Sequence, residues 1–189
     1  MREAFRLTQD RKTRDRRTGW GPCADQGSGD GNLTQTTTYP GGSQAPRITQ
    51  SYFNWRDEQV ASKSGIILNS DGSENRAAEN DGTNRPIEFT VYDNLGEAIE
   101  QDAYTGDGVA VTTANGVVSV PDASLLRAKT TSSFDDQGNA YQASTFSVNP
   151  TTGAVGDAVT TNTFRDLRGN VIATYTARTR TGITPRRLP

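Results

Sequence analysis

Short runs of alternating apolar and polar residues recur along the chain, and polar turns separate them. Residues 87–92 alternate in this way, and so do residues 141–148. A period of two in runs rich in Thr, Val, Phe and Tyr is typical of half-buried β-strands. The pattern predicts an all-β fold of antiparallel hairpins that form an open or solenoid-like sheet. Only residues 74–80 could form a helix, of two turns at most.

Three of the predicted turns share a short motif in which an Asp stands three residues before a Gly. The pairs are Asp93 with Gly96, Asp135 with Gly138, and Asp166 with Gly169. The Asp side chain can accept a hydrogen bond from the backbone two residues on, and the Gly can adopt the positive φ that closes the turn. A degenerate fourth copy begins at Asn54, where Asp57 replaces the Gly. We therefore expect only the side-chain hydrogen bond of the turn there, without the positive φ that Gly supplies.

An aromatic residue accompanies each of these turns. The four repeat aromatics are Phe53, Tyr92, Phe134 and Phe164. The first three directly precede the Asn or Asp, whereas Phe164 sits one place early. From Asp93 to Asp135 the distance is 42 residues, and from Asp135 to Asp166 it is 31. Periods of about 20 to 50 residues are typical of repeat architectures.

These units resemble those of the YD-repeat or Rhs family, which carry a Tyr-Asp-x-x-Gly signature followed by a strand. Residues 91–99 match it best, and residues 134–139 match with Phe in place of Tyr. The resemblance covers roughly residues 33–175. It implies a piece of a large β-sheet shell, which in some members encloses a toxic C-terminal domain that this chain lacks. It also implies a longer, secreted or cell-surface bacterial parent.

Charge divides the chain into three parts. Residues 1–20 hold seven basic and three acidic residues, and residues 178–189 hold four basic residues and no acidic one. Between these ends, nine basic residues face nineteen acidic ones. We expect a disordered, Gly-rich arm over residues 1–32, a repeat region over 33–177 and a disordered tail over 178–189. The basic ends lack the interleaved aromatics of a nucleic-acid site, so no nucleic acid is expected.

The composition argues against a compact enzyme. Hydrophobic residues make up only 32% of the chain, and the mean hydropathy is -0.72. The absence of His removes the common catalytic relays, and the single Cys23 forms neither an internal disulfide nor a thiolate cluster. The Gly-rich stretches 25–32 and 69–74 lack the spacing of a calcium loop. The sequence therefore predicts no catalytic residue, cofactor, metal or membrane span.

Three hypotheses for function remain. The first is a non-catalytic structural or interaction module, whose partners are neighbouring β-repeats of a longer chain or further copies paired through strand edges. The second is a carbohydrate-binding module that uses the aromatics near the turns. The third is a glycosidase-like enzyme with two carboxylates, for which the turn residues Asp93, Asp135, Asp136 and Asp166 are the candidates.

Overall fold

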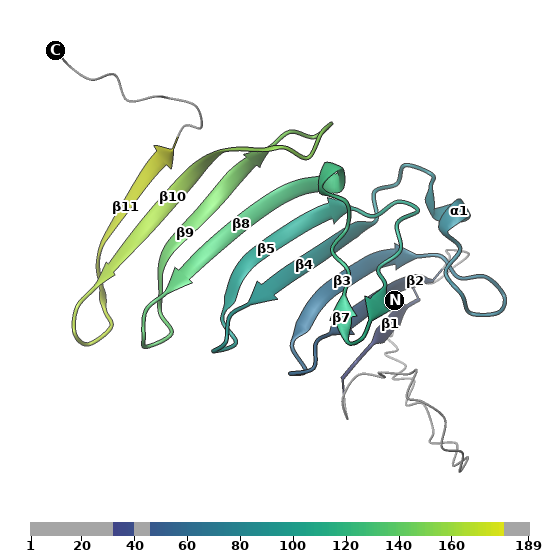
Figure 1. The fold of residues 1–189 in the computed structure, drawn as a ribbon, viewed down its shortest axis with the longest axis horizontal. Helices are drawn as coiled ribbons and strands as arrows, with labels where there is room; N and C mark the ends of the chain where they lie inside the picture. Colours follow the sequence, from purple (N-terminus) through teal and green to yellow (C-terminus); the bar gives the residue numbers. More distant parts are fainter. Residues whose placement is uncertain (1–31, 40–45, 180–189) are drawn as a thin grey trace, which may run out of the picture. The chain divides into compact units, whose positions relative to one another are not determined.

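The computed structural model describes residues 32–39 and 46–179, which are built mainly of β-strands (Figure 1). The predicted arms, residues 1–32 and 178–189, and Cys23 lie outside the described residues, except for Asn32, Arg178 and Thr179. The strands are β1 (Gln35–Thr38), β2 (Arg47–Phe53), β3 (Gln59–Ile66), β4 (Pro86–Tyr92), β5 (Ala98–Thr105), β6 (Thr113–Ala114), β7 (Val117–Val118), β8 (Leu126–Phe134), β9 (Ala140–Val148), β10 (Val155–Arg165) and β11 (Val171–Thr179). A four-residue helix, α1 (Arg76–Glu79), and a 3-10 turn, η1 (Ala123–Leu125), complete the described elements.

Nine of the strands form one antiparallel sheet in the order β1-β2-β3-β4-β5-β8-β9-β10-β11. The order follows the chain except that residues 106–125 intervene between β5 and β8, and β6 and β7 pair with each other separately. The prediction of an antiparallel all-β fold is confirmed. The sheet is not closed, and β1 and β11 stand at the two ends of its strand order.

The described residues fall into two compact units. The first comprises residues up to 87 together with residues 106–120. Its apolar core is small and consists of Ile48, Ala61, Ile66, Ile87, Val111 and Val118. Gly106 permits a close backbone approach in this unit, since a Cβ there would lie 2.3 Å from the Arg85 carbonyl oxygen and 2.7 Å from Ile87 Cγ1.

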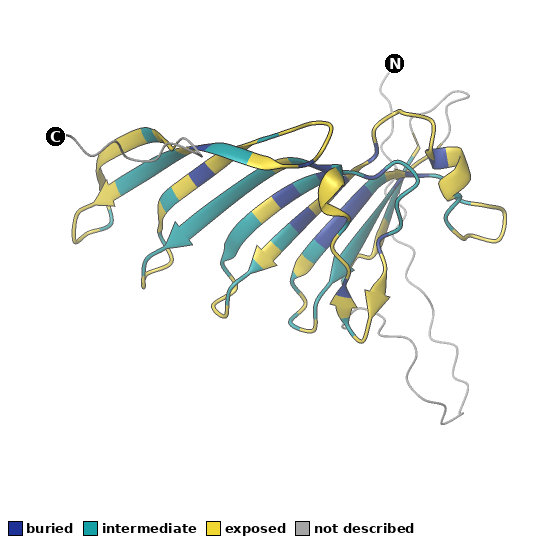
Figure 2. Cartoon of the chain, turned by 45° about the horizontal axis from the view of Figure 1, so that its top comes forward, coloured by how far each residue is buried: buried dark blue, intermediate teal, exposed yellow. Residues whose placement is uncertain are grey.

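The second unit comprises residues 88–105 and residues from 121 onward. Strands β5, β8, β9, β10 and β11 pair in sequence within it, and its buried apolar residues are Phe89, Tyr104, Leu126 and Ala158. Burial falls off along the strand order, so that most of β11 is exposed (Figure 2). β11 also continues through Arg178 and Thr179, two residues past the expected end of the repeat region.

Local sequence explains where α1 lies. Asn75 caps α1, because its side-chain oxygen accepts a hydrogen bond from the Ala78 backbone N–H at 3.1 Å. The helix ends at Glu79, before Asp81 and Gly82, and Gly82 has a φ of +73°. Its length lies within the two turns that the sequence predicts for residues 74–80.

Candidate functional site

The hairpin turn between β8 and β9 shows the hydrogen-bonded turn that recurs along the chain. The Asp135 side-chain oxygen Oδ1 accepts hydrogen bonds from the backbone N–H groups of Gln137 and Asn139, both at 2.9 Å. The Gly138 N–H donates to the Asp135 carbonyl, and the Asp135 N–H donates to the Asn139 carbonyl. Five residues thus close the turn with four hydrogen bonds and need no help from the rest of the chain.

The same four hydrogen bonds recur in three other hairpins. They begin at Asn54 between β2 and β3, at Asp93 between β4 and β5, and at Asp166 between β10 and β11. The turns of β4–β5, β8–β9 and β10–β11 lie at the same end of the second unit (Figure 1). The structure therefore places each of the predicted turn residues in one common geometry.

The fourth position of every turn has a positive φ. Gly96, Gly138 and Gly169 have φ values of 83°, 77° and 82°. Asp57 occupies this position in the turn that begins at Asn54, and its φ is +62°. The expectation that this turn keeps only its side-chain hydrogen bond, without the positive φ, is wrong. Asp tolerates the left-handed region better than most residues.

A register shift in the strand pairing lies just before the turn in three of the hairpins and shows which residue takes the place of the aromatic in the last copy. The pairing register shifts at Phe53 in β2, at Phe134 in β8 and at Arg165 in β10. Arg165, rather than Phe164, therefore occupies the position that Phe53 and Phe134 hold in their hairpins. Phe53, Tyr92 and Phe134 are partly buried, whereas Phe164 is exposed.

The fifth position of the turn pairs its side chain with the first. Asn139 and Asn170 donate their side-chain amides to the carboxylates of Asp135 and Asp166. In the turn that begins at Asn54 the roles are exchanged, since the Asn54 amide donates to Glu58 at 2.7 Å. Each of these three turns thus joins one carboxylate to one amide.

The turn of β4 and β5 instead brings two carboxyl groups together. Backbone donors, those of Glu97 and Leu95 among them, lower the pKa of Asp93. Desolvation raises the pKa of Glu97, and the charges of Asp93 and of Asp135 in the next turn raise it further. Glu97 therefore carries a charge that its neighbours disfavour.

A shallow hollow of about 400 Å³ opens between the turns of β8–β9 and β10–β11. The ladder between β9 and β10 ends at the pair Asn162 and Gln142, although both strands continue toward their turns. The two hairpin tips are not joined by ladder bonds beyond that pair. Exposed Tyr141 and Phe164 line the hollow together with the polar side chains of both turns.

The turn carboxylates are engaged in the turns themselves. Hydrogen bonds from the turn lower the pKa values of Asp93, Asp135 and Asp166, so these groups stay ionised and hold the backbone. Asp71, in the loop considered for calcium, likewise accepts from the backbone and hydroxyl of Ser73. Among the described residues no group of three or more acidic, His or Cys side chains is arranged to hold a metal ion.

A buried ionic cluster in the first unit was not anticipated from the sequence. Lys63 in β3 and Glu79 in α1 are both fully buried, and Lys63 Nζ donates to Glu79 Oε2 at 2.6 Å. Lys63 also donates to Glu74 and, at 2.6 Å, to the Val109 carbonyl. The other oxygen of Glu79 accepts from the Ile67 N–H. The cluster ties β3 to α1, the segment before it and the 106–120 segment.

Arg85 extends this polar network within the first unit. Its guanidinium donates to both oxygens of Asp81, to the Glu79 carbonyl and to the Gly65 carbonyl. Asp107 accepts from the Arg85 backbone N–H at 2.8 Å. The hydrogen bonds from Arg85 lower the pKa of Asp81 strongly. Arg85 thus fastens the C-terminal end of α1 to β3, which points to a structural role.

A second, smaller cluster lies on β5 and β8 in the second unit. Lys129 forms ion pairs with Glu100 at 2.5 Å and Asp102 at 3.5 Å, and the Tyr104 hydroxyl donates to Asp102. Desolvation raises the pKa of Asp102, and burial followed by the Asp102 charge raises that of Tyr104. The cluster forms part of the sheet, since Asp102 and Lys129 are paired positions of β5 and β8.

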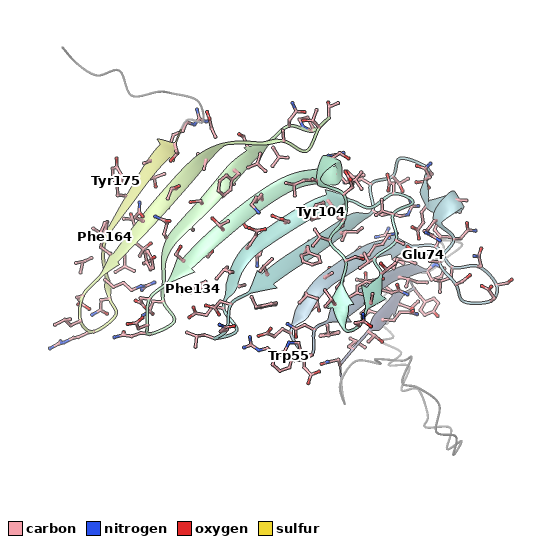
Figure 3. The ribbon with its side chains drawn as sticks, viewed as in Figure 1. Trp55, Glu74, Tyr104, Phe134, Phe164 and Tyr175 are labelled. Atoms are coloured by element: carbon pink, nitrogen blue, oxygen red, sulfur yellow. The ribbon has the colours of Figure 1, made fainter. Side chains whose placement is uncertain are left out.

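The last strand offers backbone groups for pairing. β11 follows only β10 in the strand order, and its other edge has no partner strand among the described residues. Its exposed side chains include Val171, Ile172 and Tyr175, and Tyr175 lies on this strand in Figure 3. Trp55, at the turn of β2 and β3, is also exposed, so neither aromatic contributes to a core.

Comparison with known proteins assigns no family to this chain. No family model matches it, and no curated protein matches it at a significant level. In the part of the chain that the structure describes, no helix is long and apolar enough to cross a membrane. The proposed function accordingly follows from the turns, the buried clusters and the sheet edge.

Proposed function

We propose that this chain is a non-catalytic structural or interaction module, whose hairpin repeats extend a β-sheet in the manner of part of a YD-repeat or Rhs shell. The observation that carries the proposal is the recurrence of one five-residue turn, with the same four hydrogen bonds, in four hairpins. A turn that closes itself can be repeated without redesigning the core, which is what a repeat array requires.

The partners of such a module are strands, either from neighbouring repeats of a longer chain or from further copies of this one. Support comes from β11, which leaves a nine-residue edge without a partner in the described part of the chain. Each turn carboxylate accepts backbone N–H groups of its own turn, which favours scaffolding over carboxylate catalysis.

Adding repeats to the end of the sheet tests the proposal. A second copy of residues 126–179, which contains two complete hairpins, is joined after Thr179 through a copy of the β9–β10 turn, residues 149–154, in place of residues 180–189. The proposed function predicts that the urea midpoint of unfolding rises, because the added hairpin covers the edge of β11. A control appends the same residues in scrambled order. An unchanged midpoint, or an equal rise with the scrambled segment, would contradict the repeat function.

Carbohydrate binding is a second candidate, which the hollow between the last two turns favours. Tyr141 and Phe164 are 45% and 52% exposed and can stack on the apolar faces of sugar rings, while Asp136 and Gln137 supply hydrogen-bonding groups. Glycan-array binding that is lost in Tyr141→Ala and Phe164→Ala, and kept in Tyr175→Ala outside the hollow, would support it. Equal loss in all three variants, or no binding by the unmodified chain, would exclude this site.

A further inference from the structure

Among the described residues, no strand pairs with the outer edge of β11. In an antiparallel sheet the last strand directs alternate N–H and C=O groups away from its only neighbour, and such a row is a template for another strand. β11 is nine residues long and contains no Pro, and its only charged residue is Arg178. The register shift in its pairing with β10 lies at Arg165, beside the turn, so the remainder of the edge is regular.

The other end of the strand order differs from β11. β1 has only four residues, Gln35–Thr38, and all are polar. In β11, by contrast, Val171, Ile172 and Tyr175 are 51%, 67% and 60% exposed. Long, apolar, uncharged edges pair with other strands, whereas short polar ones resist pairing. Strand addition is therefore expected at β11.

The sequence of β11 complements itself. If two copies pair antiparallel over their full length, the two-fold axis passes through Tyr175, the middle residue of Val171–Thr179. Tyr175 then lies opposite Tyr175 of the second copy, and Thr174 lies opposite Thr176. Aromatic pairs and Thr pairs at directly opposite positions each contribute roughly 0.2 to 1 kcal/mol. No other register in which the two strands keep this symmetry pairs all nine residues.

The charge on β11 is compatible with this pairing. Arg178 lies opposite Ile172 of the second copy, so the two Arg178 side chains belong to positions six residues apart along the paired strands. At a rise of about 3.3 Å per residue that separation is about 20 Å. The screening length at physiological ionic strength is only about 8 Å, so the two cations do not oppose association.

We propose that a second copy of this chain pairs antiparallel with β11 about a two-fold axis at Tyr175, forming a homodimer joined by main-chain hydrogen bonds. The inference rests on the proposed function and names the partner at one end of the sheet. Backbone hydrogen bonds join the two strands, and the Tyr175 pair together with the Thr174–Thr176 pairs fixes the register.

Cysteine cross-linking tests the register. In a Cys23→Ser background, Tyr175→Cys places two thiols at directly opposite positions, whose Cα atoms are about 4.5 to 5.5 Å apart in an antiparallel pair. That distance permits a disulfide. Ile172→Cys is the matched control, since its two copies would lie about 20 Å apart. Oxidised Tyr175→Cys should run as a covalent dimer on a non-reducing gel, and Ile172→Cys should not. Equal cross-linking of both variants, or of neither, would overturn the register.

Sedimentation velocity of the full chain, with Cys23→Ser to exclude disulfides, tests the association itself. The chain should show a monomer–dimer equilibrium that shifts with concentration. Tyr175→Lys sets two cations opposite each other and removes the aromatic pair, so it should weaken association about tenfold or more. Trp55→Lys likewise replaces an exposed aromatic residue with a cation, at the turn of β2 and β3, and should leave it unchanged. A chain that stays monomeric at all concentrations, or two variants with equal effects, would overturn the dimer.

The two proposals fail in different ways. If the chain is monomeric but gains stability from appended residues 126–179, the sheet-extending function stands and the homodimer is wrong. If the chain dimerises through Tyr175 but gains nothing from the appended hairpins, the homodimer stands and the repeat function is wrong.

Discussion

Replacing Lys63 with methionine should strongly destabilise the first unit. All three protons of the Lys63 ammonium group are used, by Glu74, Glu79 and the Val109 carbonyl. Methionine retains the unbranched apolar stem but donates nothing. Glu79, which is fully buried, would keep only the Ile67 N–H as a donor to its carboxylate.

The magnitude follows from this burial. Removing one partner of a buried ion pair costs about 3 to 5 kcal/mol, because the remaining charge is left without compensation. Domains are stable by only about 5 to 15 kcal/mol, so the loss is a large fraction of the total. A partly exposed pair offers the contrast. Arg56 and Glu58 are 3.3 Å apart with side chains 28% and 16% exposed, and Arg56→Met should cost about 1 kcal/mol or less.

Urea unfolding followed by far-ultraviolet circular dichroism measures these differences. The double variant Lys63→Met/Glu79→Gln removes both charges, and its Gln side-chain oxygen can still accept from the Ile67 N–H. It should therefore recover a large part of the stability that the single variant loses. A cost below about 1 kcal/mol for Lys63→Met would refute the reasoning, and so would a double variant less stable than the single one.

Three further predictions concern the turns. Gly169→Ala should lower the free energy of unfolding by about 1 to 2 kcal/mol through backbone strain alone, because φ is +82° and the added Cβ would meet no atom within 4 Å. Asp57→Gly should instead stabilise its turn, because Gly adopts positive φ without strain. Urea midpoints of both variants equal to that of the unmodified chain would contradict the strain. Asp135→Asn should leave the urea midpoint nearly unchanged, since Asn54 makes the same turn bonds, and a large loss would show that the charge is needed. Glu97→Gln should raise the midpoint at pH 7. The pKa of Glu97 is raised on folding, so its charge destabilises the folded state above that pKa; the gain should vanish as the pH falls to about 4.5, and a gain that grows at low pH would reverse the sign.

The repeated turns can be predicted from the sequence, because every hydrogen bond that closes them lies within five residues. An Asp or Asn that caps its own backbone and a Gly three residues later are sufficient, and tertiary contacts do not alter the result at Asp93, Asp135 or Asp166. Asp57 departs from the rule that Gly supplies positive φ, since Asp tolerates the left-handed region better than most residues and its N–H still donates to the Asn54 carbonyl. Period-two alternation likewise predicts strands, because it depends on adjacent residues alone.

Only the tertiary structure brings Lys63 to Glu79 and to the Val109 carbonyl, which are 16 and 46 residues away in the chain. A buried Lys is indistinguishable in sequence from a solvated one, because its burial depends on what the loops cover. That β11 ends the sheet in the described part of the chain is also a property of strand order, which no local pattern encodes. The sequence alone therefore determined the turns and the strand pattern, since these depend on near neighbours. The ionic cluster and the open edge were decided by contacts between segments that are distant in the chain.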